Sequence, residues 1–297
     1  MSERGTTLNP LYEAAADFES DYTSVPAASA DDISVDWPCD VEAAAQVYKH
    51  WGCVLVRGLL SDIAEQIRQD GETMAQSVRD ADYDKRANAL LMPGDKTGNR
   101  KQIMLFCPTY PVASSHFQAA VDSRVADLLE AFIGPNVELY GQGMYMYKEP
   151  EGGMEKAMHQ DAPYFYHRNH SFCTAFVHVV PTTEKNGCLR VVPGTSKLGL
   201  LAHEDSFSHL ALSKDKFPLE KAVQVHGQPG DVVFFNYLTV HGSGNNNSDG
   251  PRPALCMQYR SAEDEQVWQG SAQIETLGVP ADTPRANTAM LRGVKLG

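Results

Sequence analysis

The sequence lacks a long apolar run, which argues against a protein that spans a membrane with helices. No uninterrupted apolar stretch reaches the length of about 20 residues that a bilayer-spanning helix requires. The N-terminal residues 1–5 lead into polar sequence and contain no signal-peptide core. We therefore expect no membrane insertion and a cytoplasmic protein.

The sequence also lacks closely spaced cysteine pairs and an excess of positive charge. None of the six cysteines forms a C-x-x-C pair, so neither a zinc site nor a disulfide framework is predicted. The formal net charge is −13, whereas binding to nucleic acid phosphates requires a basic face. These absences predict reduced thiols and no nucleic acid partner.

The chain is long enough for a sizeable core. It has 297 residues, of which 42% are hydrophobic and 21% charged, as in an ordinary globular protein. Residues 1–35 are rich in Ala, Ser, Thr and acidic residues and predict a mobile N-terminal arm. We assign residues 36–297 to a single domain.

Helical signals dominate the first half of that domain. Asp40 caps a predicted helix that Gly52 ends, and an apolar run at 53–56 predicts a strand. A second helix is predicted from Ser61 through Met74, and a third over 115–133. Residues 80–100 lack a clear period and predict an irregular loop.

The second half changes to short β-rich runs separated by turn residues. This order predicts an α+β chain with a mainly β, jelly-roll-like core at about 137–261. The long loop 198–221 is a candidate for substrate specificity. The C-terminal tail 262–297 either closes the barrel mouth or packs against a second subunit of a homo-oligomer. The predicted strands span 137–148, 173–180, 188–192, 222–226, 232–237 and 254–259.

His159 and Asp161 are the first candidates for chemistry. In a strand, residues two apart project from the same face, so this imidazole and carboxylate would converge. His241 would complete a set of two histidines and one carboxylate. This ligand set suits non-haem Fe(II) enzymes that activate O2.

Arg252 and Ser243 extend the pattern beyond metal binding. A 2-oxoacid can chelate such an iron, and the far carboxylate of 2-oxoglutarate then needs a fixed cationic partner. Arg252 can supply a bidentate pair and Ser243 a hydroxyl. The combination predicts 2-oxoglutarate as a cosubstrate.

Together these motifs resemble the phytanoyl-CoA dioxygenase family of Fe(II)/2-oxoglutarate oxygenases. The resemblance covers about 54–261 and implies a double-stranded β-helix, which is a cupin-like jelly-roll. It also implies hydroxylation of a small or lipophilic substrate with release of succinate and CO2. The matching segments are Met158–Asp161, Asn186–Lys197, Gly230–Phe235 and His241–Gly244, followed by Arg252.

The resemblance assigns further residues to the site. Met144, Phe176 and either Lys101 or its neighbour Gln102 would contact 2-oxoglutarate. Family members that halogenate have a small residue where this chain has Asp161, so halogenation is disfavoured. Expected substrate contacts are Tyr164, Phe165 and His178, the last of which is otherwise a core histidine.

The remaining histidines are predicted to have no role in metal binding. His167 and His170 are expected on a surface loop near the site mouth, and His226 is expected to be structural. Four others are expected on the surface, namely His50, His116, His203 and His209.

Several alternatives remain open at this stage. The chain could be a catalytically silent jelly-roll binding protein, or a zinc hydrolase with the same ligands. The substrate could be an acyl-CoA, whose phosphates would meet Lys185, Arg190 or Lys197, or a natural product undergoing tailoring. Hydroxylation, desaturation, epoxidation and rearrangement are not separated by the sequence.

Overall fold

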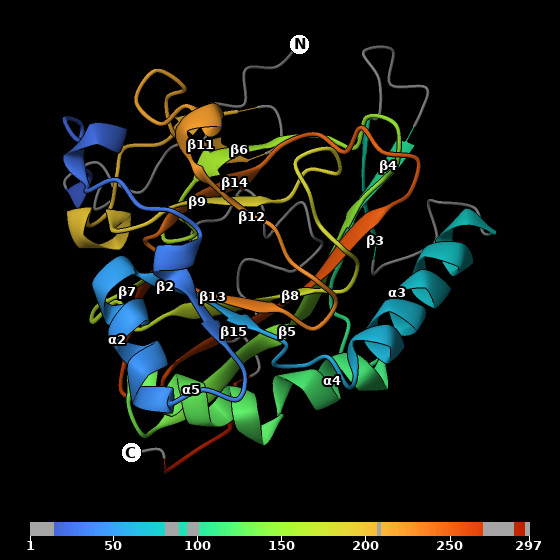
Figure 1. Ribbon diagram of the computed structural model, residues 1–297, viewed down its shortest axis with the longest axis horizontal. Coiled ribbons are helices and arrows are strands. Elements are labelled where there is room, and N and C mark those ends of the chain that lie inside the picture. Colours follow the sequence, from blue (N-terminus) through green and yellow to red (C-terminus); the bar gives the residue numbers. More distant parts are fainter. Residues whose placement is uncertain (1–14, 81–88, 94–100, 207–208, 270–287, 295–297) are drawn as a thin grey trace.

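Two β-sheets face each other, and helices cover the outer side of the larger sheet (Figure 1). The structure is a computed structural model that describes residues 15–80, 89–93, 101–206, 209–269 and 288–294. The two facing sheets agree with the predicted jelly-roll core. Within the described residues, no helix has the length and apolar character needed to cross a membrane.

Helix α2, Val41–Trp51, confirms the first predicted helix at both ends. The Asp40 side chain accepts a hydrogen bond from the backbone N–H of Glu42, which caps the helix. Gly52 ends it in the left-handed conformation, with a φ of 74°. The strand that follows, β2, spans Cys53–Arg57.

The predicted helix over 115–133 is two helices, so this prediction was wrong in one respect. Helix α4 spans Ser114–Ala120, and α5 spans Ser123–Ile133. The break occurs because the Asp122 side chain accepts from the backbone N–H of Arg124 and starts a new helix.

Two other boundaries differ from the predictions. Helix α3 spans Ala64–Arg79, so it starts later than Ser61 and continues beyond Met74. The segment predicted to be an irregular loop contains strand β3, Ala89–Pro93, which pairs with β4, Lys101–Phe106. Residues 81–88 and 94–100 of that prediction lie outside the described residues.

The larger sheet has the order β1-β2-β13-β8-β15-β5-β4-β3, and β17 pairs with β5. Strand β5 has the bounds that its apolar alternation predicts. The strands not yet given are β1 Ser34–Asp36, β5 Val137–Lys148, β8 Cys173–His178, β13 Val232–Asn236, β15 Arg252–Ser261 and β17 Ala289–Met290.

The smaller sheet has the order β12-β9-β14-β6. Its short strands β6 and β14 carry the two candidate histidine ligands. Two separate pairs, β10–β11 and β7–β16, lie beside the main sheets. The bounds are β6 Lys156–His159, β7 Phe165–His167, β9 Leu189–Val192, β10 Glu204–Asp205, β11 Leu210–Ala211, β12 Val223–Val225, β14 Val240–Ser243 and β16 Gln266–Gln269.

Two apolar clusters hold these layers together. One packs α2, α3, α4 and α5 against the larger sheet and includes Ile67, Leu128 and Phe234. The other lies between the two sheets and includes Val191 and Val233. Burial of both clusters removes apolar surface from water and stabilises the fold. The second cluster surrounds the candidate site.

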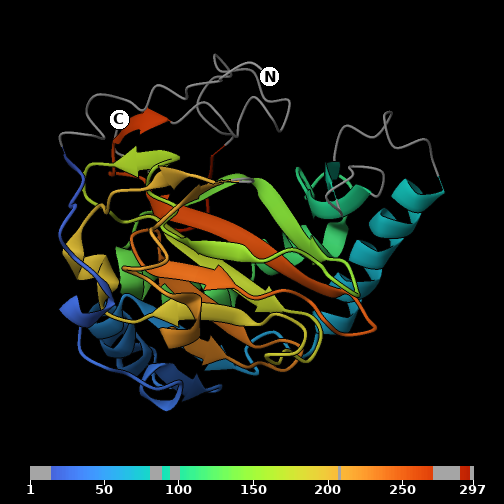
Figure 2. The ribbon, with the colours of Figure 1, turned by 90° about the horizontal axis from the view of Figure 1, so that it is seen from above.

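The chain ends and the long loop pack on this core where they are described. Asp17 pairs with Leu201, and Ile33 is buried. The loop 198–221 follows the 3-10 turn η4, Thr195–Leu198, and contains the hairpin β10–β11 and the 3-10 turn η5, Leu219–Lys221. Figure 2 shows α3 at one end of the molecule and the N-terminal segment near η1, Tyr22–Ser24, at the other.

Candidate metal centre and cosubstrate pocket

The structure brings His159, Asp161 and His241 together. One potential ligand atom from each residue lies within 4.8 Å of the others. Both histidine Nε2 atoms are 3.7 Å from Asp161 Oδ1. Among the described residues, this is the cluster of His, Cys, Asp and Glu side chains that could hold a metal ion.

The two histidines meet because their strands are paired. His159 ends β6 and lies directly opposite His241 of β14 in the antiparallel ladder. Asp161, however, lies beyond the end of β6, so the expectation that it shares a strand with His159 was wrong. Its backbone N–H donates to Tyr237 O at 2.9 Å, which bends the chain and returns the carboxylate to the histidines.

Backbone carbonyls orient both imidazole rings. His159 Nδ1 is 2.9 Å from Ala157 O, and His241 Nδ1 is 2.9 Å from Thr239 O. A carbonyl only accepts, so each Nδ1 carries a proton and Nε2 is the ring nitrogen left for a metal. Burial, together with the neighbouring His241 and His209, holds the pKa of His159 well below its usual value. The neutral ring is the form that binds a metal.

Gln160 separates the two ligands and points the other way. Its Nε2 donates to Leu238 O at 2.7 Å and to Gly199 O at 2.8 Å, and its Oε1 accepts from Leu201 N at 2.8 Å. These bonds anchor the ligand segment to two neighbouring loops. The sequence reasoning did not single out this buried amide.

Arg252 lies at the start of β15, opposite Lys148 of β5. Its side chain is buried, and Nη2 donates to Gly187 O at 2.8 Å, whereas Nε has no partner among the described residues. Burial lowers the pKa of Arg252 to about 10. A buried guanidinium with unused donors is suited to an anionic ligand.

A cavity of about 330 Å³ joins the metal centre to Arg252. It is mostly apolar with a few convergent polar groups, as is usual for small-molecule sites. Lys101 lies on β4 next to Gln102, and its side chain is outside the described residues. The predicted site residues that line the cavity, besides the three ligands and Arg252, are Ser243, Met144, Phe176, Gln102, Tyr164 and Phe165.

His178 is not among the cavity-lining residues, so the structure does not support the predicted substrate contact. The ring is buried beside Gly227, with Nδ1 3.1 Å from the Thr182 hydroxyl. Burial lowers the pKa of His178 to about 3. This environment agrees with the alternative of a core histidine.

Four other histidines correct the surface prediction. His116, His167, His203 and His209 are all buried. His203 Nε2 accepts from Gln160 N at 2.9 Å, and the His209 ring lies 4.9 Å from that of His159. His50 and His226 are exposed. Contacts between distant segments create these environments, which local sequence polarity cannot indicate.

Two lysines at the cavity, Lys148 and Lys156, were missed as site residues. The Lys148 ammonium donates to Met154 O at 2.5 Å and to Gly244 O at 2.6 Å. Burial, followed by the charges of Arg252 and Lys156, holds the pKa of Lys148 well below its usual value. Lysine on a β-rich run normally indicates a solvated face, so the sequence provided no signal.

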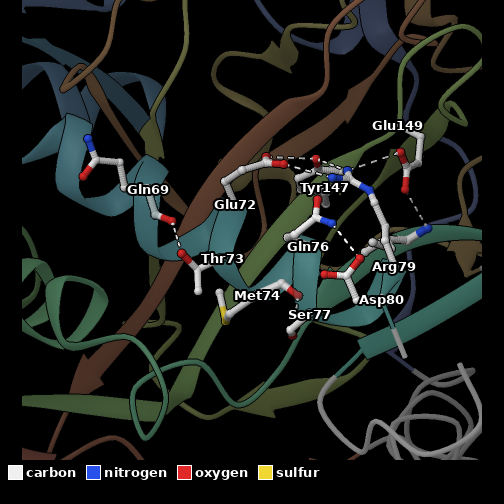
Figure 3. Close-up of polar contacts among 11 residues, drawn as sticks. Gln69, Glu72, Thr73, Met74, Gln76, Ser77, Arg79, Asp80, Tyr147 and Glu149 are labelled. Atoms are coloured by element: carbon white, nitrogen blue, oxygen red, sulfur yellow. Dashed lines mark hydrogen bonds and ion pairs between the residues drawn. The ribbon is translucent and has the colours of Figure 1, made fainter. Parts of the chain in front are cut away.

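A polar network connects α3 to the cavity wall (Figure 3). Arg79 donates to the Tyr147 hydroxyl at 2.6 Å and to Glu72 at 2.9 Å, and lies 3.9 Å from Glu149. Tyr147 and Glu149 both line the cavity. The network therefore compensates the Glu149 charge and fixes this wall on the helix.

The donor set fits a non-haem iron centre. Two imidazoles and one carboxylate on one side leave the opposite side open to the cavity, which suits Fe(II) with exchangeable positions. A zinc hydrolase would not explain the buried Arg252 in the same cavity. Iron with an anionic cosubstrate accounts for both features.

The chain matches the family model "Phytanoyl-CoA dioxygenase (PhyH)" over residues 48–254. It is 35% identical over 147 residues to a probable phytanoyl-CoA dioxygenase of Caenorhabditis elegans, with 46% of this chain and 47% of that protein covered. It is 27% identical over 242 residues to the peroxisomal phytanoyl-CoA dioxygenase of Mus musculus, covering 73% and 67%. The first match thus spans about half of the relative's length.

A solved structure of similar fold is the non-haem alpha-ketoglutarate-dependent epimerase SnoN from nogalamycin biosynthesis. The TM-score is 0.63 with 22% identity, covering 86% of this chain and 96% of that chain. This similarity confirms the predicted jelly-roll fold. The family match covers more than two thirds of the sequence and contains all three candidate ligands. The chain belongs to the phytanoyl-CoA dioxygenase (PhyH) family.

Proposed function

We propose that this protein is an Fe(II)- and 2-oxoglutarate-dependent dioxygenase that hydroxylates an unactivated C–H bond of a small or lipophilic organic substrate. The observation that carries the proposal is the joint placement of the His159–Asp161–His241 cluster and the buried Arg252 in one cavity. Family membership and the fold of SnoN support it.

His159, Asp161 and His241 would hold the iron. Each Nδ1 proton is bonded to a backbone carbonyl, so both Nε2 atoms remain for the metal, each 3.7 Å from Asp161 Oδ1. When bound, Fe(II) supplies the activation of O2 that is coupled to decarboxylation of 2-oxoglutarate to succinate and CO2. The protein thereby provides three fixed ligands and leaves room for the cosubstrate.

Arg252 and Ser243 would bind the distal carboxylate of 2-oxoglutarate. Arg252 Nε has no partner in the part of the chain that the structure describes. Ser243 lies two residues beyond His241 on β14, on the same side of the strand. The Phe176 ring lies beside the guanidinium, with its centroid 5.8 Å from Arg252 Cζ, and Met144 lines the same cavity. These apolar walls exclude water and strengthen the charge pair.

Tyr164 and Phe165 would form part of the substrate wall. Both follow the metal ligands directly and line the cavity. The Tyr164 hydroxyl accepts from Leu210 N at 2.9 Å, so the loop 198–221 holds this wall in place. That contact supports the loop as a determinant of specificity.

The alternatives are less well supported. A silent binding protein would not need all three ligands and Arg252 in one cavity. For an acyl-CoA substrate, Arg190 would be a poor phosphate contact because it is buried and paired with Glu184 at 2.9 Å. Lys185 and Lys197 are exposed. Neither lysine lines the cavity, so we place a smaller organic molecule, such as a natural product, ahead of an acyl-CoA.

The decisive experiment is anaerobic and needs no substrate. Fe(II) and then 2-oxoglutarate are added, and the visible charge-transfer band of the chelate is recorded. We expect the band in the wild type, its loss in His241→Ala, and a much higher 2-oxoglutarate requirement in Arg252→Ala. A folded wild type that binds iron without forming the band would contradict the cosubstrate. Equal 2-oxoglutarate affinity in Arg252→Ala would contradict the role of Arg252.

A further inference from the structure

Lys156 faces the cavity because of an irregularity in β6. Ser243 of β14 pairs with Lys156 and His241 with His159, so Gly242 lies opposite two residues, Ala157 and Met158. Such a β-bulge changes which side chains share a face. Lys156 therefore lies on the same side as His159, although it is three residues away.

Gly242 makes this bulge possible. A Cβ at position 242 would lie 2.8 Å from Lys156 O and 3.2 Å from Met158 N. Only glycine fits against the bulged backbone without moving it. The orientation of Lys156 toward the cavity thus depends on the bulge in β6 and on Gly242 in β14.

Three other charged groups at the cavity have partners. The Lys148 ammonium is bound to two backbone carbonyls, Glu149 lies near Arg79, and Glu155 is bound by Lys214 at 3.1 Å. No acceptor for Lys156 Nζ occurs among the residues that the structure describes. Burial lowers the pKa of Lys156 to about 8, and the Asp161 charge opposes this effect. A partly buried cation that faces a cavity and has no acceptor among the described residues favours an anionic ligand.

The position of Lys156 indicates which anion this is. It pairs with Ser243, two residues along β14 from the metal ligand His241. Two residues of a strand span about 7 Å, which is comparable to the separation of the two carboxylates of 2-oxoglutarate. A cosubstrate chelated beside His241 would therefore extend its far carboxylate toward Ser243, Lys156 and Arg252.

We propose that Lys156 is a second cationic anchor for the distal carboxylate of 2-oxoglutarate, acting beside Arg252 and Ser243. This inference rests on the proposed function. A carboxylate has two oxygens that together accept several hydrogen bonds. Arg252 reaches it from the larger sheet and Lys156 from the smaller sheet, so the cosubstrate links the two layers.

The test compares two 2-oxoacids in wild type and Lys156→Met. 2-Oxopentanoate keeps the chelating end and the chain length of 2-oxoglutarate but lacks the distal carboxylate. Dissociation constants are measured by calorimetry on Mn(II)-loaded protein, so that no turnover is needed. We expect Lys156→Met to weaken 2-oxoglutarate binding by about tenfold or more, with 2-oxopentanoate binding unchanged.

Matched variants identify the cause. Lys156→Arg keeps the charge and is expected to recover part of the affinity, and the exposed Lys185→Met is expected to have no effect. Unchanged 2-oxoglutarate affinity in Lys156→Met would overturn the inference. Lys156 would then be expected to bind an anionic group of the primary substrate. An equal loss for both 2-oxoacids would also overturn it. Failure of wild type to bind either 2-oxoacid would contradict the proposed function itself.

Discussion

Gly71 of α3 lies directly against the ring of Tyr145 in β5. A Cβ at position 71 would be 2.1 Å from Tyr145 Cζ, and the ring is fully buried and stacked on His116 at 4.9 Å. The helix can approach the sheet this closely only because residue 71 has no side chain.

Gly71→Ala is therefore expected to destabilise the protein. In an unobstructed helix this change stabilises by about 0.5–1 kcal/mol, but overpacking typically costs about 1–3 kcal/mol. We expect a lower free energy of unfolding in urea. Thr73→Ala, at an exposed position of the same helix, is the control and should change stability little. An increase in stability for Gly71→Ala would show that the ring can move.

His241→Ala is expected to abolish tight metal binding. Loss of a residue that only orients a ligand lowers metal affinity by about 10- to 100-fold, so loss of the ligand itself should exceed about 100-fold. Anaerobic titration with Co(II), followed by its visible absorption, measures this affinity. His226→Ala removes an exposed histidine and serves as the control. Equal affinities in the two variants would refute the assignment of the metal centre.

Gln160→Leu is expected to loosen the ligand segment. The substitution leaves Leu238 O, Gly199 O and Leu201 N without their side-chain partner. Each unsatisfied buried group costs about 1–3 kcal/mol, so the free energy of unfolding should fall by roughly 3 kcal/mol or more. Gln69→Leu, on the exposed side of α3, is the matched control. Similar stability of both variants would argue against anchoring by Gln160.

Acid should destabilise the fold through His167. This buried ring places Nδ1 2.9 Å from Phe165 O, and its Nε2 accepts from Arg260 Nη1 at 3.2 Å. Burial, with Arg260 and His170 nearby, lowers the pKa of His167 to about 4, and Asp264 opposes this effect. Arg260 is itself paired with Glu138 at 2.9 Å. A proton on Nε2 would remove an acceptor and place two cations together.

The sign of this effect follows from proton uptake. Below a pH of about 6.5 the unfolded chain protonates His167, whereas the folded protein does not until about pH 4. Stability is therefore lost as pH falls from about 6.5 to 4, by roughly 3 kcal/mol. In His167→Gln this part of the pH dependence should disappear in urea unfolding at several pH values. If the free energy of unfolding of His167→Gln depended on pH as in the wild type, the acid sensitivity would belong to other groups.

Much of the sheet could be predicted because its strands are apolar runs bounded by turn residues. The bounds of β5 were predicted without error. The bounds of β6 and β14 were not predicted, because these strands are short, contain polar residues and depend on each other for pairing. The split between α4 and α5 was missed because the apolar stripe continues across Asp122, and one side chain bond decides the break.

The clustering of His159, Asp161 and His241 could be predicted from residue type and spacing, but not its local geometry. The prediction placed Asp161 in a strand, whereas the bond of its N–H to Tyr237 O turns the chain out of the strand. Residues of the loop beyond 198 contact the segment around His159. Gln160 bonds to Leu201 and His203, and the His209 ring bonds to Ala157 O. A single sequence does not reveal such long-range contacts.

The bulge between Lys156 and His159 has a consequence for comparing this chain with its relatives. In a regular ladder Ala157 would lie opposite Ser243, whereas here Lys156 does. The residue that meets the cosubstrate is thus the third before the first metal ligand in a bulged strand, and the second in a regular one. Alignments that count positions from His159 will compare side chains on opposite faces wherever one chain has the bulge and the other does not.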